Sequence, residues 1–306
     1  MSVSLTTTYA GEFSGKYIAA ALLSASTLDN NAITILPNVK FKSVIQKAST
    51  DDIVKDASCD FVTDAGTLTL TEAVLTPKEL QVNLQLCKKD LHDSWEAAQM
   101  GYSAFDNLAP NFADFVIGHV ASKVADKMER NIWSGAAATS GEFDGFTALL
   151  TADGTVNDVT ATTVTAANVI AELGKIVDAI PTAVYGKEDL TLYVSSNIAR
   201  AYVRALGGFA TDLGANGTDN KGTQWYNGGQ LSFDGINIFV AKGLADNTAV
   251  AAEKSNLFFG TGLLSDTNEV KVIDMSDIDG SQNVRVVMRF TGGVQHAIGS
   301  DIVLYS

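Results

Sequence analysis

The chain has 306 residues, 46% of them hydrophobic, and a formal net charge of -14. This length and apolar content allow one large domain or two modest ones with a real core. The acidic balance argues against a basic groove for nucleic acid. Cys59 and Cys87 are the only cysteines. Two cysteines make no disulfide framework and have no zinc-type spacing, so we expect two buried or half-buried thiols in a reducing compartment.

The N-terminal region predicts an arm. Residues 13–22 place apolar side chains at helical spacing, and Asp29-Asn30-Asn31 ends that element. The apolar run of residues 17–25 is preceded by Glu12 and by a single cation, which does not fit a signal peptide. No segment reaches the ~18 consecutive apolar residues of a membrane-spanning helix. We therefore expect an amphipathic arm that packs on another element, and no membrane.

Residues 33–89 predict β-structure. The segments 53–66 and 67–86 are rich in Thr, Val and Leu, and their apolar and polar residues alternate. Gly66 and Pro77 stand where turns are needed. Because this stretch has few bulky aromatic residues, it cannot form an independent globule. We expect a long β-excursion that lies on another surface.

A long helix is predicted next. Its apolar stripe repeats every four residues, widened by Phe115, and consists of Phe112, Val116, Val120, Val124, Met128 and Ile132. The opposite face carries Asp114, Lys123, Asp126, Lys127 and Arg130. Pro110 fits the first turn, and Asn107 or Asn111 is the candidate N-cap. The mixture of Lys123, Lys127 and Arg130 with Asp126 and Glu129 predicts local ion pairs on this helix.

The remainder predicts an α/β lobe followed by strands. Residues 151–166 are small and polar, which marks an internal boundary. We expect a helix over 169–180 that stops at Pro181, a buried strand over 190–194, a helix over 196–206 and a glycine-rich loop over 207–230. Strands are then predicted over 233–241, 256–262, 269–275, 283–290 and 295–306.

No pattern of residues predicts chemistry. His92, His119 and His296 are far apart in the sequence and form no ligand pair. No nucleophile elbow, phosphate loop or dinucleotide fingerprint is present. Asp277-Ile278-Asp279-Gly280 does not fit a calcium loop, and an acidic turn between strands explains it better. We therefore predict no catalytic, cofactor-binding or metal-binding residues, and no enzyme.

The end of the long helix has a local signature. Glu129 precedes Ile132-Trp133-Ser134-Gly135, the small residues 136–140 and the turn Gly145-Phe146. Upstream, residues 78–95 look like a strand that returns and enters a helix, and residues 283–306 look like a final strand pair with Arg289 in it. Together with the order of the predicted elements along the chain, this signature resembles that of the major capsid protein of tailed bacteriophages with the Hong Kong 97-type fold.

The resemblance implies an α+β architecture with named parts. These are an N-arm (1–34), an extended β-hairpin called the E-loop (35–88), a P-domain with the spine helix (89–165), an α/β A-domain (166–283) and C-terminal strands shared by the P- and A-domains (284–306). It also predicts a corner where the helix ends. There we expect Trp133 to anchor the turn, the small residues to permit close approach, and Gly135 to need backbone angles closed to other residues.

The resemblance implies a structural function. The chain would self-assemble through pentamers and hexamers into an icosahedral shell that encloses double-stranded DNA without sequence-specific binding. The shell would be the virion capsid, assembled in the host cytoplasm, and separate scaffolding, portal and decoration proteins are left open as partners. Some relatives cross-link a loop lysine to a neighbour. Lys42, Lys47 and Lys55 lie in the loop, but no motif marks a partner, and that activity is not carried over.

Two alternatives remain open from the sequence. An encapsulin-like shell that encloses protein cargo shares the same fold. A secreted β-rich adhesin or surface-layer protein would also be acidic, rich in threonine and poor in cysteine, although it calls for a signal peptide. Electron microscopy of the purified chain distinguishes closed shells from planar arrays, filaments and small particles.

Overall fold

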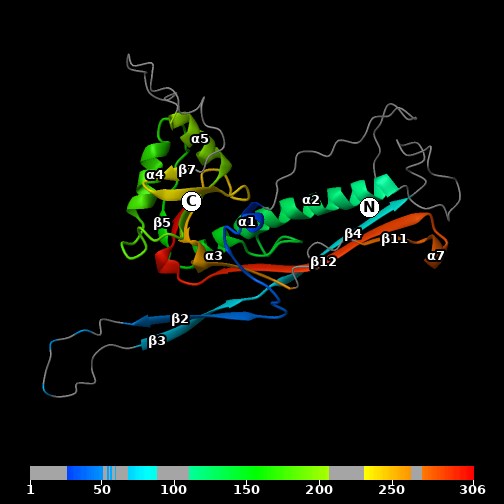
Figure 1. The fold of residues 1–306 in the computed structure, drawn as a ribbon, viewed down its shortest axis with the longest axis horizontal. Helices are drawn as coiled ribbons and strands as arrows, with labels where there is room; N and C mark the ends of the chain where they lie inside the picture. Colours follow the sequence, from blue (N-terminus) through cyan, green and yellow to red (C-terminus); the bar gives the residue numbers. More distant parts are fainter. Residues whose placement is uncertain are drawn as a thin grey trace, which may run out of the picture.

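The computed structural model describes residues 26–50, 54, 56, 59, 68–87, 110–206, 231–262 and 271–306. The molecule is elongated, with a lobe at one end, a long sheet and helix at the other, and a thin hairpin that leaves the body (Figure 1). The predicted arm before residue 26, His92 and the glycine-rich loop 207–230 lie outside the described residues. No helix in the described part is long and apolar enough to cross a membrane.

Five strands of the described chain form the long sheet. They are β1 (Thr34–Leu36), β4 (Lys78–Cys87), β10 (Leu257–Thr261), β11 (Lys271–Asp274) and β12 (Asn283–His296). β12 is the central strand and pairs antiparallel with β4 along the whole length of β4. On its other edge, β12 pairs with β11 near one end and with β10 near the other. β1 extends the sheet by pairing parallel with β10.

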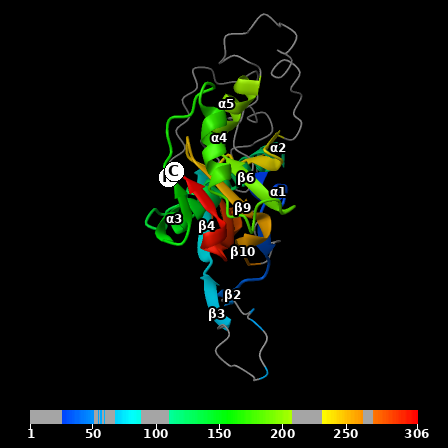
Figure 2. The ribbon, with the colours of Figure 1, turned by 90° about the vertical axis from the view of Figure 1, so that its left-hand side faces the viewer.

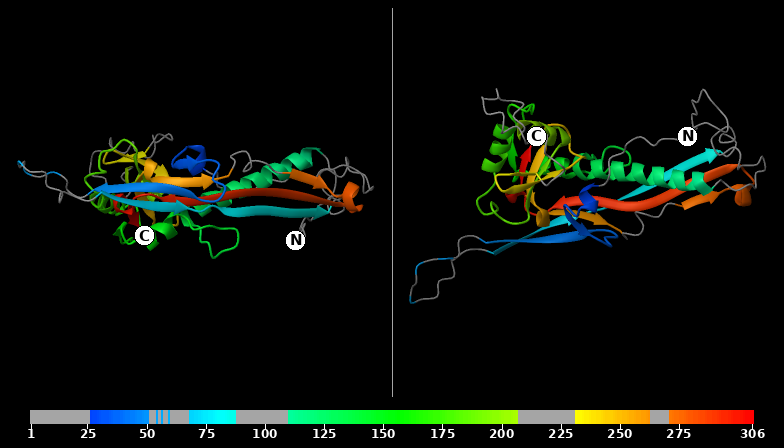
Figure 3. Two further views of the ribbon diagram at one scale, coloured as in Figure 1. Left: turned by 90° about the horizontal axis from the view of Figure 1, so that it is seen from below. Right: turned by 45° about the horizontal axis from the view of Figure 1, so that its top comes forward.

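The long helix α2 (Pro110–Ser134) lies along one face of this sheet (Figures 1 and 3). Alternate residues of β4 and β12, such as Leu80 and Met288, are buried in one core with Met128 and Ile132 of α2. This two-layer packing follows from the two periods, four residues in the helix and two in the strands. It confirms the predicted apolar stripe from Val120 onward.

The start of α2 differs in one detail from the prediction. Pro110 is the first residue of the helix, as expected. Asn111 lies within the helix and so cannot be its N-cap, whereas Asn107 and the side chains of Phe112, Phe115 and Val116 lie outside the described part.

The lobe contains a second sheet, whose strand order among the described residues is β5-β13-β9-β6-β8-β7. The strands are β5 (Asn157–Val159), β6 (Leu190–Val194), β7 (Leu231–Phe233), β8 (Ile236–Val240), β9 (Ala249–Glu253) and β13 (Val303–Tyr305). Helices α4 (Val169–Asp178) and α5 (Ser196–Leu206) pack together in this lobe (Figure 2).

The second sheet separates two hydrophobic cores. In β6, Leu192 and Val194 face the core made with α4 and α5, whereas Tyr193 between them faces the core made with α2 and the long sheet. The short helix α3 (Phe146–Ala152) joins this second core through Phe146 and Leu150. Residues 151–166, where a boundary was predicted, connect the two cores, because Val156 belongs to the core made with α2 and the long sheet and Val164 to the core made with α4 and α5.

The hairpin consists of β2 (Ser43–Thr50) and β3 (Leu68–Leu75), paired antiparallel from Ser43↔Leu75 to Thr50↔Leu68. β3 continues through Thr76 and Pro77 into β4, so one extended segment changes its partner from β2 to β12. Two glycines permit this crossing. A Cβ on Gly260 would overlap the side chain of Leu75, and a Cβ on Gly293 would lie 3.0 Å from Cα of Pro77.

Several predicted elements are confirmed. β6 and α5 span the predicted ranges, and α4 ends before Pro181. The acidic segment after β11 is a short turn of helix, α7 (Ser276–Asp279), which joins β11 to β12 and ends at Gly280 with φ 71°. Likewise, α1 (Ser26–Asp29) ends before Asn31, whose φ is 48°.

Other predictions are wrong. The segment 233–241 is not one strand, because Asp234 and Gly235 have φ of 46° and 79° and form the two-residue turn between β7 and β8. Val54 and Asp56 do not belong to a strand, and β9 was not predicted as an element, whereas β2 lies within the β-structure predicted for residues 33–89. Cys59 is exposed, not buried, although Cys87 is half-buried as expected.

Candidate functional site

The first candidate region is the corner at the end of α2, where Trp133 is fully buried. Its ring packs against Tyr193 of β6 and Phe146 of α3, with ring centroids 5.0 and 5.4 Å away. Its Nε1 donates a hydrogen bond to Oγ1 of Thr27 at 2.8 Å. The predicted role of Trp133 as an anchor is confirmed, since one side chain joins α2, the second sheet and α1.

Glu129 lies one helical turn before Trp133 and is also fully buried. It accepts hydrogen bonds from the backbone N–H of Thr27 at 3.0 Å, from the Thr27 hydroxyl at 2.6 Å and from the Ser26 hydroxyl at 3.4 Å. Burial raises the pKa of Glu129, and these hydrogen bonds oppose that shift because they favour the carboxylate. The carboxylate therefore ties α1 to the long helix.

This position corrects the prediction for the charged face of α2. Glu129 does not pair with a neighbouring cation on the solvent side of the helix. The ion pairs found there join Arg130 to Asp126, at 3.0 Å, and Lys127 to Glu142. No local pattern of residues predicts the burial of Glu129, because its partners lie about a hundred residues earlier in the chain.

Backbone segments crowd together at the corner. A Cβ on Gly135 would lie 2.7 Å from the carbonyl oxygen of Asn131, and a Cβ on Gly145 would lie 2.6 Å from the same oxygen. A Cβ on Gly243 would overlap the carbonyl group of Glu129. Gly135 is therefore required for space. The expected backbone angles closed to other residues are not its reason, because its φ is not positive.

The small residues 136–140 do not serve the role predicted for them. All five are exposed and form a loop beside the corner. Acidic side chains hold this loop, because Glu142 accepts a hydrogen bond from the Ala136 N–H at 3.0 Å and Asp144 accepts one from the Ala137 N–H at 2.7 Å. The backbone segments instead approach each other closely at Gly135 and Gly145, which flank the loop.

The second candidate region is the uncovered face of the β2–β3 hairpin. Cross-strand partners share a face, so Val44, Gln46, Ala48 and Thr50 lie beside Val74, Glu72, Leu70 and Leu68. Leu68 and Leu70 are 65% and 73% exposed, and Val44 and Val74 are also exposed. Phe41, just before the hairpin, is 76% exposed. The predicted β-excursion without a core of its own is confirmed for these residues.

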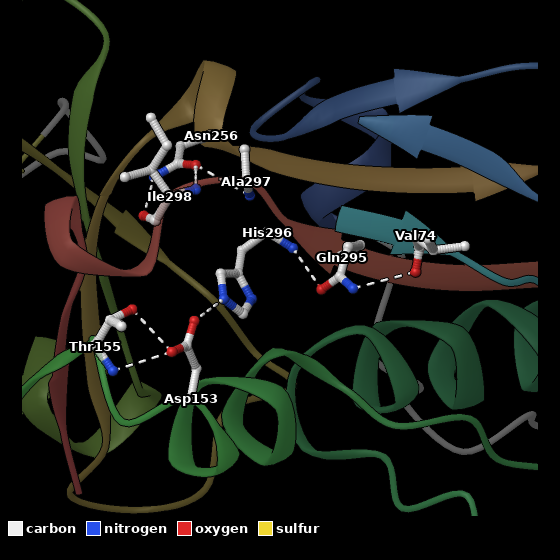
Figure 4. A network of polar contacts seen from close by, with 8 residues as sticks. All are labelled: Val74, Asp153, Thr155, Asn256, Gln295, His296, Ala297 and Ile298. Atoms are coloured by element: carbon white, nitrogen blue, oxygen red, sulfur yellow. Dashed lines mark hydrogen bonds and ion pairs between the residues drawn. The ribbon is translucent and has the colours of Figure 1, made fainter. Parts of the chain in front are cut away.

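The third region is the junction where β12 leaves the long sheet and the chain continues to β13 (Figure 4). Nε2 of the buried His296 lies 2.8 Å from Oδ2 of Asp153, which follows α3. Asp153 also accepts hydrogen bonds from the backbone and hydroxyl of Thr155. The hydrogen bond from His296 is the main cause that lowers the pKa of Asp153 to about 2.

His119 is half-buried on α2, as predicted, and His296 lies at the end of β12, so the structure places them on different elements. Among the residues that the structure describes, no group of three or more His, Cys, Asp or Glu could hold a metal ion. Of the loop lysines, Lys47 lies within β2, and the Lys42 ammonium lies 5.5 Å from the ring centroid of Phe41.

The architecture matches solved virus and particle shells. The capsid of a native GTA particle, computed with C5 symmetry, covers 95% of this chain and 93% of its own, with 13% identity and a TM-score of 0.66. Gordonia phage Cozz matches at 13% identity and a TM-score of 0.60, over 95% of this chain and 89% of its own. The capsid of Myoviridae phage XM1 matches at 10% identity and a TM-score of 0.60, over 100% of this chain and 95% of its own.

Neither a family model nor a curated protein sequence matches the chain. At 10–13% identity the likeness to the solved structures is one of fold. The chain has the α+β, Hong Kong 97-type fold of tailed-phage capsid proteins, and the resemblance inferred from the sequence is confirmed at this level.

Proposed function

We propose that this chain is a major capsid protein, a structural subunit without enzymatic activity. Many copies assemble through pentamers and hexamers into an icosahedral shell that encloses double-stranded DNA. The observation that carries the proposal is the likeness of fold over almost the whole chain to several capsid structures. In this function the shell is the virion capsid, and its subunits assemble in the host cytoplasm.

The hairpin supports self-association. A two-stranded ribbon is marginal on its own in water. The apolar side chains on its free face, above all Leu68 and Leu70, would remain exposed in a monomer. A neighbouring subunit that covers this face removes both problems, and the resulting contact per subunit should exceed ~2,000 Å² because obligate interfaces are large.

The division into parts is also a proposal. The N-arm (1–34), E-loop (35–88), P-domain (89–165), A-domain (166–283) and shared C-terminal strands (284–306) agree with the order of elements along the chain. The pairing of β4 with β12 and of β10 and β11 with the same strand joins residues of three of these proposed segments, the E-loop, the A-domain and the C-terminal strands. The E-loop as an independent unit is then the part between Ser43 and Leu75.

The test is electron microscopy of the purified full-length chain after negative staining. Closed shells of uniform diameter, built of rings of five and six, are the expected result. A stable monomer at high concentration would overturn the proposal, and so would planar arrays or filaments, which indicate a surface-layer protein or adhesin. Nucleic acid inside the shells, detected by nuclease protection after expression with the other proteins of its genome, distinguishes a capsid from an encapsulin-like shell.

A further inference from the structure

A groove on the long sheet collects positive charge in an acidic protein. It has a volume of about 630 Å³ and lies beside the β4–β12 pair, near the end of β10. Lys40 and Arg289 line it, and both are exposed. Glu79 is the one acidic residue among the described residues that line it. The groove is therefore net positive, although the whole chain carries -14.

These two cations differ from four others that the structure describes. Elsewhere, Lys127, Arg130, Lys175 and Lys187 each pair with a carboxylate. Within the part of the chain that the structure describes, neither Lys40 nor Arg289 has a carboxylate within ion-pair distance. Glu79 balances at most one of the two positive charges in the groove, so a second acidic group placed between Lys40 and Arg289 would reduce their repulsion.

The free face of the hairpin carries a matching charge. Of the eight side chains that the β2–β3 register places on this face, Glu72 is the only charged one. It is exposed, and no cation in the described residues pairs with it. Apolar residues surround it, with Leu70 and Val74 two positions away on the same strand. Covering this face without a cation opposite Glu72 would bury an unpaired charge, which is costly.

We propose that the Lys40–Arg289 groove of one subunit receives Glu72 from the hairpin of a second copy. The pairing fixes the register in which the hairpin lies on its neighbour, because displacement of the hairpin would bury Glu72 and leave both cations unpaired. The apolar side chains of the hairpin contribute buried area to the contact, and Glu72 determines where the hairpin lies on its neighbour. This inference rests on the proposed self-assembly and names the residues that specify one contact in it.

A charge-swap experiment on the full-length chain tests the pairing. The variants are Glu72→Lys, Arg289→Glu and the double variant Glu72→Lys with Arg289→Glu. We expect each single variant to raise the subunit concentration needed for shell formation by roughly tenfold or more, because repulsion replaces attraction at every copy of the contact. The double variant restores the opposite charges and should return this concentration to within about threefold of wild type.

The controls distinguish an effect of the substitutions on folding from an effect on assembly in general and from the loss of the contact between Glu72 and Arg289. Thermal unfolding of each subunit should not change, since Glu72 and Arg289 are exposed. Glu188→Lys with Arg204→Glu, two exposed positions on the lobe, is the matched charge-reversal control. If a reversal prevents folding, Glu72→Gln and Arg289→Gln replace it, and each should weaken the dependence of assembly on salt.

Two results would overturn the inference. Single variants that assemble like wild type would show that the two charges do not meet, and a double variant no better than the single ones would show that they act separately. In both cases wild-type shells would still form and the proposed function would stand. Failure of the wild-type chain to assemble would refute the proposed function instead.

Discussion

Trp133 and Thr27 are 106 positions apart in the chain, yet the indole Nε1 of Trp133 donates a hydrogen bond to the Thr27 hydroxyl oxygen at 2.8 Å. The same hydroxyl donates to the buried carboxylate of Glu129 at 2.6 Å. One threonine therefore satisfies two buried polar groups on successive turns of α2. This connection fixes the point at which the N-terminal segment joins the body of the subunit.

The first prediction concerns this threonine. Thr27→Val keeps the volume but removes the hydroxyl, which leaves the indole N–H without its acceptor and Glu129 with one donor fewer. We expect the free energy of unfolding to fall by about 2–4 kcal/mol, because buried polar groups are costly when unpaired. Urea unfolding of the subunit measures it. Thr27→Ser keeps the hydroxyl and should lose less than half as much, and equal losses in both variants would contradict the account.

The second prediction compares glycines. Gly135→Ala and Gly145→Ala place a methyl group within 2.9 Å of backbone atoms that cannot move independently, so both should lower the unfolding temperature markedly or abolish soluble expression. Gly118→Ala is the matched control, because this exposed glycine lies within α2 and a Cβ there meets nothing within 4 Å. It should raise stability by about 0.5–1 kcal/mol. Equal effects at all three positions would refute the crowding argument.

Elements with a strong local pattern were predictable. β6 is a short apolar run bounded by Asp189 and Ser195, and α5 follows it at once with helical periodicity. α2 was predictable because its stripe continues over several turns. By contrast, β9 reads AVAAE, and alanine has little preference for strands. It becomes a buried strand because β13 and β6 pair with its two edges, and that is information from the sheet and not from the segment.

The corner was predictable in part. A buried tryptophan beside a required glycine follows from the sequence, since both types are typical of a tight turn between packed elements. The burial of Glu129 does not, because a glutamate on a charged helix is normally solvated. Its position depends on Ser26 and Thr27, which come from another region of the chain. The exposed residues 136–140 show the same limit: small side chains alone do not tell a crowded segment from a free loop.

The third prediction removes the hairpin. Ser43 and Leu75 are cross-strand partners, so residues 44–74 can be replaced by a two-residue Asn-Gly turn without displacing Leu75, which is buried against Gly260. We expect the shortened subunit to keep a cooperative thermal transition close to that of the full chain, because the described side chains of the removed part are exposed or half-buried. It should form no stable shells.

Two measurements check this variant. Differential scanning calorimetry reports the transition, and electron microscopy reports the shells. Loss of the thermal transition would show that the hairpin belongs to the core of its own subunit. Normal shells would show that it is not needed for assembly. A control that replaces Leu68 and Leu70 with threonine keeps the hairpin and removes its two most exposed leucines, and it should weaken assembly without abolishing folding.

The fourth prediction concerns Asp153 and pH. The pKa of Asp153 in the folded subunit is about 2, against an ordinary value of 3.8, with the hydrogen bond from His296 as the first cause. A lowered folded-state pKa means that the unfolded chain binds the proton more tightly, so this carboxylate stabilises the fold above pH ~4. That contribution, about 2 kcal/mol, is lost as the pH falls from about 4 to 2.

Asp153→Asn tests the contribution while keeping an acceptor for the Thr155 N–H. Urea unfolding at pH 7 should show the variant less stable than wild type, and the difference should shrink as the pH approaches 2. An Asp158→Asn variant, at an exposed carboxylate on β5, should show no such trend. A stability difference for Asp153→Asn that stays constant from pH 7 to pH 2 would mean that packing, and not the charge, explains the effect.

The last prediction is that the isolated subunit has no appreciable affinity for duplex DNA near physiological salt. Binding to DNA depends on several cations that contact phosphates along one track and release counterions. On the outer side of α2, Lys127 and Arg130 are each compensated by a carboxylate, and the Lys40–Arg289 groove places two cations beside one acidic residue, Glu79. Two contacts give a weak, salt-sensitive interaction at most, so a shell of these subunits would retain DNA by enclosure. A gel-shift titration with a duplex of random sequence at about 150 mM salt measures this. Micromolar binding that weakens steeply with added salt would contradict the prediction and assign the subunit a direct role in holding nucleic acid.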